Sequence, residues 1–195
     1  MGDLEKSASA VADMIPFPNK KYSIIYADPP WDGLGYNKGK LGPSGSRAPA
    51  NHYSLMTADS LLNLPVQSLT AKNCALILWA TYPNLPLATR VVETWGFRYA
   101  TVAFTWVKTT VKGKWLFGCG NYTRANPEIA LLGIRGSMKR VSASIPNLVI
   151  LPATRHSEKP HAVRGKIVEL FGDLPRIELF ARQQIEGWDA WGNEV

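Results

Sequence analysis

An aspartate, two prolines and a tryptophan follow one another at positions 28 to 31, directly after the apolar run Ser23 to Ala27. This run is rich in β-branched and aromatic residues, so it predicts a buried strand, and two consecutive prolines cannot continue a sheet ladder. The carboxylate of Asp28 is therefore predicted to lie at the carboxyl end of a strand. In open α/β sheets, ligands bind at that edge.

The residues after Asp28 suit a planar ligand that carries an amino group, such as adenine. Pro29 and Pro30 form a stiff turn with outward carbonyl acceptors. A ring can stack on Trp31 while its amine donates hydrogens to Asp28 and to the Pro29 carbonyl. Accepting both hydrogens frees the nitrogen lone pair to attack a sulfonium methyl. We therefore predict methylation of an exocyclic amine, with the catalytic residues Asp28, Pro29, Pro30 and Trp31.

The tetrapeptide resembles the Asp-Pro-Pro-Trp motif of the MT-A70 family of S-adenosylmethionine-dependent adenine N6-methyltransferases, which includes phage and bacterial members. Further segments between residues 22 and 194 follow in that family's order and spacing: Tyr53 to Thr57, Leu76 to Trp79, Trp95 to Phe97, Thr105 to Thr109, Arg155 to Pro160, Ile177 to Arg182, Gly187-Trp188 and Gly192 to Glu194. The resemblance implies an α/β, Rossmann-like methyltransferase fold in a single domain. It also implies a permuted motif order, with the catalytic turn first and the cofactor-binding strand last. The absence of a G-x-G-x-x-G turn argues against nicotinamide enzymes and agrees with that order.

The same resemblance implies which residues surround S-adenosylmethionine: Asp28, Lys159, Glu178, Phe180, Arg182 and Asn193. Lys159 would contact the methionine carboxylate, and Phe180 would pack on apolar cofactor surface. Arg182 and Asn193 would hydrogen-bond the ribose or the carboxylate, and Asp28 can also face the ammonium. The chain departs from relatives of the messenger-RNA enzyme at Gln184-Ile185 and at Glu194, which leaves the ribose contacts open.

The formal net charge of +7 is unevenly placed along the chain. From Gly96 to Lys166, twelve Lys and Arg stand against two acids, Glu128 and Glu158, a net charge of +10. A one-sided basic surface suits a phosphate backbone. A long loop after residue 107 interleaves cations with aromatic residues, so we predict nucleic-acid contacts at Lys108, Lys112, Lys114, Tyr122 and Arg124.

A chain of 195 residues predicts one domain, residues 21–195, after a flexible N-terminal tail of residues 1–20. No apolar run is long enough to span a membrane and no signal-type segment begins the chain, so we expect a cytoplasmic protein. Cys74 and Cys119 lie far apart, and His156 and His161 lack a third ligand. The sequence therefore predicts free thiols and no metal site.

Hydrophobic periodicity and turn signals predict the remaining elements. Strands are expected at residues 74–80, 99–107, 129–134, 147–151 and 177–180, the last of these being the final strand. Helices are expected at residues 57–64 and 84–95, and from Ser157–Pro160 to Phe171. The Gly-rich stretch from Asp32 to Asn51 reads equally well as a lid over the substrate or as simple disorder.

DNA is the preferred substrate, because the chain is of minimal single-domain size and the family has phage and bacterial members. The same chemistry on RNA is the nearest alternative. A catalytically idle nucleic-acid-binding subunit is another, although the intact Asp28 and Trp31 argue against it. Methylation of a protein glutamine uses a related turn that begins with asparagine, so Asp28 disfavours it. The sequence does not determine the oligomeric state, and a homodimer stays open.

Overall fold

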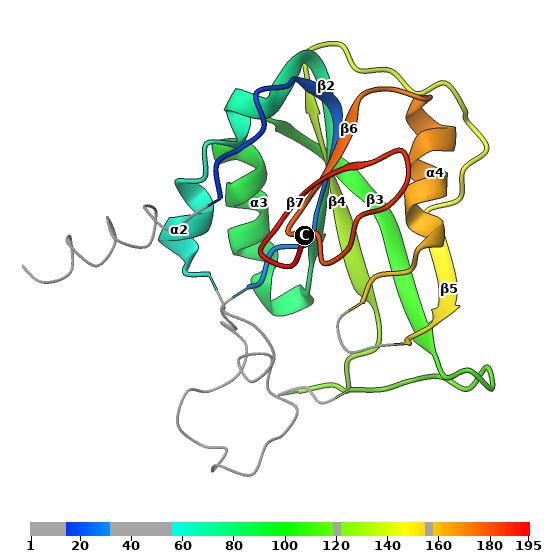
Figure 1. Ribbon diagram of the computed structural model, residues 1–195. Helices are drawn as coiled ribbons and strands as arrows, with labels where there is room; N and C mark the ends of the chain where they lie inside the picture. The colour runs from blue at the N-terminus through cyan, green and yellow to red at the C-terminus, as the bar shows by residue number, and fades with distance from the viewer. Residues whose placement is uncertain (1–14, 32–55, 119–121, 155–157) are drawn as a thin grey trace, which may run out of the picture.

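A single seven-stranded sheet runs through the described residues of the computed structural model, which are 15–31, 56–118, 122–154 and 158–195 (Figure 1). From one edge to the other its strands are β5 (Leu148–Pro152), β3 (Arg98–Thr109), β4 (Glu128–Arg135), β2 (Thr70–Ala80), β1 (Tyr22–Ala27), β6 (Arg176–Leu179) and β7 (Asp189–Trp191). β4 runs antiparallel to β2 and β3, and all other neighbours are parallel. The amino end of β4 therefore lies where the other six strands have their carboxyl ends.

Alternate residues of β1 pack into different layers on the two faces of the sheet. Ile25 and Ala27 join a core cluster with residues of α2 (Ala58–Leu62) and α3 (Leu85–Thr94). Ile24 and Tyr26 join a second cluster with residues of α4 (Ala162–Phe171). Figure 1 shows α2 and α3 on one side of the sheet and α4 on the other. This three-layer arrangement confirms the predicted α/β class.

The α2 and α3 pair forms as its capping residues predict. Thr57 accepts a hydrogen bond from the backbone N–H of Ser60 at 3.2 Å, which satisfies one free donor at the start of α2. α3 ends before Gly96, whose φ of +84° suits glycine best. Trp95 is fully buried, and its indole N–H donates to the Leu61 carbonyl at 2.8 Å. The tryptophan thus ties the two helices together, which confirms its predicted place in the core.

Several predicted element boundaries were wrong, and one strand was missed. α4 begins at Ala162, because Pro160 lies in the preceding turn and its carbonyl accepts the first bond, from the Val163 N–H at 3.1 Å. β3 extends to Thr109, so Lys108 is a strand residue. β6 is followed by β7, whose three residues are too few to show a period. The chain therefore ends on one more parallel strand than the pattern predicted.

The described part of the predicted N-terminal tail packs against β7. The Phe17 ring meets the Trp191 ring edge-on at 4.6 Å, and the Trp191 N–H donates to the Ile15 carbonyl at 2.8 Å. Lys20 forms an ion pair with Asp189 at 2.7 Å. Residues 15–20 therefore contact the folded body, and the domain boundary at residue 20 stays a prediction. Residues 1–14 lie outside the described part of the chain.

Gly133 sets how closely β4 approaches the α3 layer. A Cβ atom at this position would lie 2.9 Å from the Phe97 Cβ and 3.0 Å from a methyl group of Val92. The first distance is shorter than carbon atoms tolerate and the second is tight, so a larger residue would require a local shift. This close approach helps to fix the register of β4, and a slip of one residue would turn every side chain of the strand to the other face.

Several predictions lie outside the described residues, namely the Gly-rich stretch at 32–51, Cys119 and His156. Cys74 is described and is fully buried on β2, where removal from water raises the pKa of its thiol to about 12. Among the described residues, the helices are too short and too polar to cross a membrane.

Candidate active site

The Asp28 corner forms where β1 stops. The N–H of Trp31 donates to the Pro29 carbonyl at 2.9 Å, and the N–H of Met56 donates to the Pro30 carbonyl at 2.9 Å. Each of these two carbonyl oxygens already accepts one hydrogen bond, and each can accept a second one. The turn is thus stiff, as predicted, and Asp28 with the Pro29 carbonyl still offers two neighbouring acceptors.

Trp31 is largely buried in this structure. Its side chain is only 9% exposed and belongs to the core cluster on the α2 and α3 side of the sheet. The indole N–H donates to the Trp79 carbonyl at 3.1 Å. A base could stack on Trp31 only if the atoms that cover its ring moved away, so stacking stays a prediction. In this structure the Trp31 side chain instead helps to hold the turn in place through its hydrogen bond to Trp79.

Lys159 reaches the corner from the segment that precedes α4. Its ammonium lies 2.6 Å from Asp28 Oδ2, and the side chain is 8% exposed. The sequence assigned Lys159 to the methionine carboxylate of a cofactor and did not connect it with Asp28, which lies 131 positions earlier in the chain. The contact depends on the order of the strands, in which β2 separates β1 from β4, β3 and β5, and no local pattern reveals that order.

Glu128 is a charged residue near Asp28 that the sequence did not point to. As the first residue of β4 it lies at the edge of the sheet that carries Asp28, and its Oε2 is 3.2 Å from the Lys159 ammonium. Its other oxygen accepts from Lys108. One signal could have found it: Glu128 is one of only two acids in the strongly basic stretch from 96 to 166, and it stands at the start of a buried strand.

Burial and neighbouring charges set the protonation of these groups. Removal from water raises the pKa of Asp28, and Glu128 adds to that effect, while Lys159 and Arg182 oppose it. Burial alone would raise the pKa of Glu128, but the ammonium groups of Lys159 and Lys108 outweigh it and hold this pKa below its usual range. The two carboxylates also raise the pKa of Lys159 against the effect of its burial. Lys159 therefore stays protonated.

A buried ion pair lies beneath the corner, on the α4 side of the sheet. Arg164 of α4 donates to both carboxylate oxygens of Glu178, at 2.6 and 2.7 Å. The guanidinium also lies over the Tyr26 ring at 5.4 Å, and the Tyr26 hydroxyl accepts from the Trp79 indole at 2.7 Å. Glu178 was predicted to bind the cofactor. The structure instead gives its carboxylate an internal partner, and a contact with the cofactor stays a prediction.

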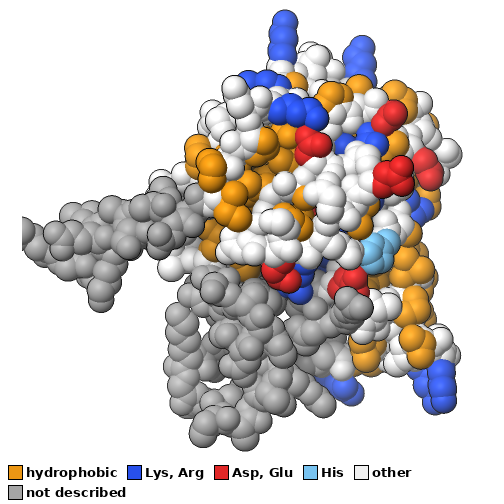
Figure 2. Space-filling view, in the orientation of Figure 1, with side chains coloured by type: hydrophobic (Ala, Val, Ile, Leu, Met, Phe, Trp, Pro, Cys, Tyr) orange, Lys and Arg blue, Asp and Glu red, His pale blue; other side chains and the backbone are white. Residues whose placement is uncertain are grey.

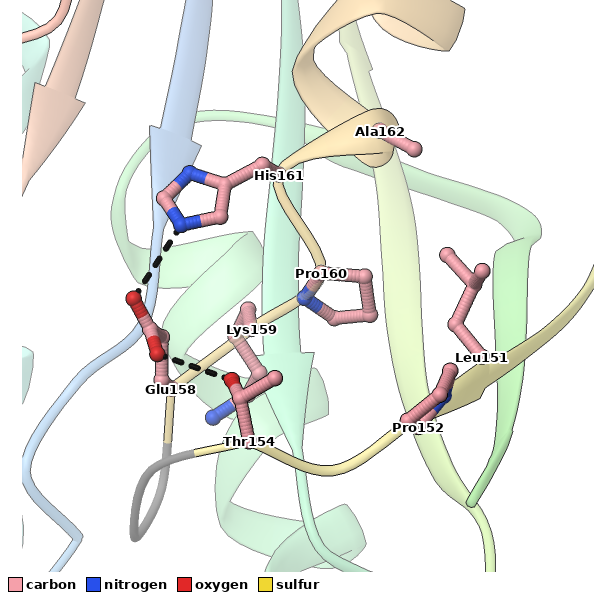
Figure 3. A pocket seen from close by; sticks show the side chains of 8 residues that line it. All are labelled: Leu151, Pro152, Thr154, Glu158, Lys159, Pro160, His161 and Ala162. Carbon is pink, nitrogen blue, oxygen red and sulfur yellow. Dashed lines mark hydrogen bonds and ion pairs between the residues drawn. The ribbon is translucent and has the colours of Figure 1, made fainter. Parts of the chain in front are cut away.

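A pocket of about 260 Å³ adjoins the corner (Figure 3). Lys159 lines it and also contacts Asp28, so the pocket and the corner share a wall. At its rim, Glu158 accepts from the Thr154 hydroxyl at 2.9 Å and lies 3.1 Å from His161 Nε2. His161 therefore has a carboxylate partner in the described structure. The remaining lining residues are Leu151, Pro152, Pro160 and Ala162.

The other predicted cofactor residues lie on the loops that follow β6 and β7. Ala27 pairs with Leu179, and Leu179 pairs with Trp191, so these loops emerge beside Asp28. Phe180 has a φ of +61° and meets the Trp191 ring edge-on at 5.6 Å. Arg182 lies 3.7 Å from Glu194, and Asn193 is exposed. The fold thus brings Phe180, Arg182 and Asn193 to the edge of the sheet that carries Asp28.

The predicted nucleic-acid loop is an arm that extends from the end of β3 and returns to the start of β4. We call its described residues, 110–118 and 122–126, the arm. Backbone bonds near its base include Leu116 N–H to the Lys108 carbonyl at 3.1 Å, and the Asn126 amide donates to the carbonyls of Lys108 and Leu116 at 2.9 and 2.6 Å. Basic side chains project from its end in Figure 2. The exposed residues of the arm include Lys112, Lys114, Trp115, Phe117, Tyr122 and Arg124.

Lys108 does not belong with the arm, although the sequence grouped it there. Its ammonium pairs with Glu128 and lies 5.0 Å from the centre of the Trp106 ring. Lys159 and Arg164 are likewise held in internal ion pairs. Three of the twelve cations counted between 96 and 166 therefore neutralise acids within the fold, and the basic surface is smaller than the sequence predicted.

Comparison with known proteins identifies the family. The MT-A70 family model matches residues 22–194. The chain belongs to the MT-A70 family. MT-A70 enzymes use S-adenosylmethionine to methylate the N6 amine of adenine, which confirms the predicted reaction class and cofactor.

Relatives of this MT-A70 chain include proteins of very different length. It is 36% identical over 191 residues to the Type II methyltransferase M.MunI of Mycoplasma sp, covering 91% of this chain and 79% of that protein. It is 28% identical over 204 residues to the human N(6)-adenine-specific methyltransferase METTL4, covering 96% of this chain and 40% of that protein. It is 26% identical over 182 residues to the human N(6)-adenosine-methyltransferase catalytic subunit METTL3, covering 90% of this chain and 28% of that protein. The chain therefore spans most of the first protein and less than half of the other two.

Proposed function

We propose that this chain transfers the methyl group of S-adenosylmethionine to the N6 amine of adenine in DNA. The observation that carries the proposal is the Asp28 carboxylate, held at the end of β1 by Lys159 at 2.6 Å and followed by the rigid Pro29 carbonyl. Two fixed acceptors beside each other match the two hydrogens of an exocyclic amine.

Asp28 and the Pro29 carbonyl would orient the amine for attack. By accepting its two hydrogens, they favour a pyramidal nitrogen whose lone pair points away from both acceptors. Because the acceptors are fixed before the substrate binds, little reorganisation is required in the transition state. The ionised carboxylate of Asp28 accepts more strongly than the protonated acid would, and Lys159 stabilises the ionised form.

The cofactor would lie against the loops that follow β6 and β7, and when bound it supplies an electrophilic methyl group. Arg182 and Asn193 carry donors suited to ribose hydroxyls or a carboxylate, and both are exposed. Phe180 presents a partly exposed ring for apolar cofactor atoms. Asp28 and Lys159 can meet the ammonium and the carboxylate of the methionine part. Glu178 would act indirectly, through its ion pair with Arg164.

Nucleic-acid binding is proposed for the arm, through Lys112, Lys114, Tyr122 and Arg124. Three cations and an exposed aromatic ring can contact phosphates and stack on bases. Arg124 lies 5.6 Å from the centre of the Phe117 ring, so cation and aromatic side chains are already adjacent. A duplex adenine would have to leave its stack to reach Asp28, at a cost of roughly a few kcal/mol.

DNA is preferred over RNA on grounds of similarity and length. The chain spans 79% of the Type II methyltransferase M.MunI but only 28% of METTL3. A methylation assay with matched DNA and RNA oligomers, read by mass spectrometry of the nucleosides, tests this preference. Activity on DNA is expected, and activity confined to RNA would overturn it.

Calorimetry with S-adenosylmethionine distinguishes an active enzyme from a catalytically idle nucleic-acid-binding subunit. We expect a measurable heat when S-adenosylmethionine is added to the purified chain, because the loops after β6 and β7 keep polar donors exposed. Nucleic-acid binding without any such heat would favour the idle subunit. A homodimer stays a prediction that sedimentation analysis of the same sample tests.

A further inference from the structure

Four charged side chains of alternating sign form a row that ends at Asp28. Lys108 of β3 donates to Glu128 of β4, and the other oxygen of Glu128 lies 3.2 Å from the Lys159 ammonium. Lys159 in turn lies 2.6 Å from Asp28. We call these four residues the charge row. Side-chain exposure is 22% at Lys108 and 8% at Lys159, so water screens these charges poorly.

Lys108 is placed to neutralise Glu128 rather than to bind a phosphate. Its ammonium is engaged by the carboxylate and by the Trp106 ring at 5.0 Å. A phosphate could bind Lys108 only by competing with Glu128. The removal of Lys108 would leave Glu128 with Lys159 as its remaining cation in the row.

We propose that Lys108 is a positioning residue for methyl transfer, which acts through Glu128 to keep the Lys159 ammonium on Asp28. Without Lys108, Glu128 draws Lys159 toward itself, and Asp28 loses part of the charge that stabilises its ionised form. The inference rests on the proposed function, because it takes ionised Asp28 as the acceptor of the adenine amine.

Other charged and titratable groups also face Asp28. Arg182, on the loop after β6, favours its ionised form, and Glu128 disfavours it. Tyr26 of β1 interacts electrostatically with Asp28 as well. Neither Arg182 nor Tyr26 is replaced in the Lys108 variants, so a change in the titration of Asp28 is attributed to the charge row.

The first test is the pH profile of kcat for two single variants and their combination. Lys108→Met should move the acidic limb to higher pH by roughly 0.5 to 1 unit, because one cation is lost from the row. Glu128→Gln should move it to lower pH, because Glu128 then no longer competes with Asp28 for the Lys159 ammonium. The double variant should lie near the parent. Lys108→Arg should restore the limb, and Lys72→Met, at an exposed lysine near the start of β2, is the matched control.

A second measurement does not depend on activity. Carbon-13 NMR of the carboxyl group of Asp28, assigned with Asp28→Asn, follows its titration in the enzyme without substrate. The same opposite shifts are expected for Lys108→Met and Glu128→Gln. If they occur while no adenine is methylated, the charge row stands and the proposed function fails.

Three results would overturn the inference. Lys108→Met could raise KM for the nucleic acid and reduce its salt dependence with the limb unmoved, which indicates a phosphate contact. It could lower kcat equally at every pH, which indicates a structural role. If Lys108→Met does not fold, the Glu128→Gln variant becomes the deciding test. The proposal is then refuted if Asp28 does not titrate at a lower pH in that variant than in the parent.

Discussion

The Asp28 corner and the arm contain the same kinds of residue and use them in opposite ways. At the corner, Lys108 and Lys159 are paired with carboxylates and little exposed. On the arm, Lys112 and Lys114 are exposed to water beside exposed aromatic rings. The net charge of a segment therefore does not reveal its role. A cation that has an acid within the fold shapes a site, whereas an exposed one is available to a partner.

Asp28→Ala should have the largest effect, because it removes an acceptor that acts directly on the amine. We expect kcat to fall at least roughly 100-fold, the scale for loss of one preorganised electrostatic contact. Cofactor affinity, measured by calorimetry, should fall far less than kcat, because Asp28 is only one of several residues proposed to hold the cofactor. Asp59→Ala, an exposed acid on α2, is the matched control. A variant that keeps more than half of the parent rate would contradict the catalytic role.

The Glu178→Gln variant measures how much the internal ion pair between Arg164 and Glu178 contributes to the stability of the fold. The change leaves the guanidinium of Arg164, a residue that is only 8% exposed, without the Glu178 carboxylate. Breaking a buried pair in this way should lower the free energy of unfolding by about 3 kcal/mol or more, measured in urea. Glu186→Gln changes an exposed acid and should have little effect. A loss below about 1 kcal/mol would show that Arg164 finds other partners.

Replacing Lys112, Lys114 and Arg124 together with alanine should weaken DNA binding roughly tenfold at low salt. The slope of log affinity against log salt should fall by about 2 to 3, since each phosphate contact contributes about 0.9. The value of kcat at saturating DNA should stay unchanged, because the corner is intact. An equal loss of charge at exposed Arg98, Lys139 and Arg140 is the control. If both triple variants weaken binding equally, the arm is not a specific contact.

Tyr122→Ala should have the smallest effect. The side chain is fully exposed, so the folded protein loses no internal contact. Loss of one stacking ring should weaken DNA binding roughly fivefold without changing the salt slope, as a binding titration would show. Tyr122→Phe keeps the ring and should bind like the parent. Should Phe and Ala weaken binding alike, the hydroxyl group and not the ring makes the contact.

Local patterns predicted the strands and the main helices because hydrophobic periodicity and caps are local signals. The turn at Pro29-Pro30 and the cap at Thr57 illustrate this. The charge row could not be predicted, because Lys108, Glu128 and Lys159 meet Asp28 only through the order of strands in the sheet. β7 was missed because three residues show no period. The Trp31 ring was expected to be open to a ligand. The residue types of a short motif do not reveal which distant parts of the chain will bury an aromatic ring.

The reversed direction of β4 has a wider consequence for finding catalytic groups. Parallel strands contribute the residues that come after them, whereas a single inverted strand contributes the residue with which it begins, as Glu128 shows. Which residue of β4 lies beside Lys159 depends on the alignment of the strand five positions further along, where Gly133 meets the helix layer. We expect a methyl group added there, far from Asp28, to shift Glu128 relative to Lys159.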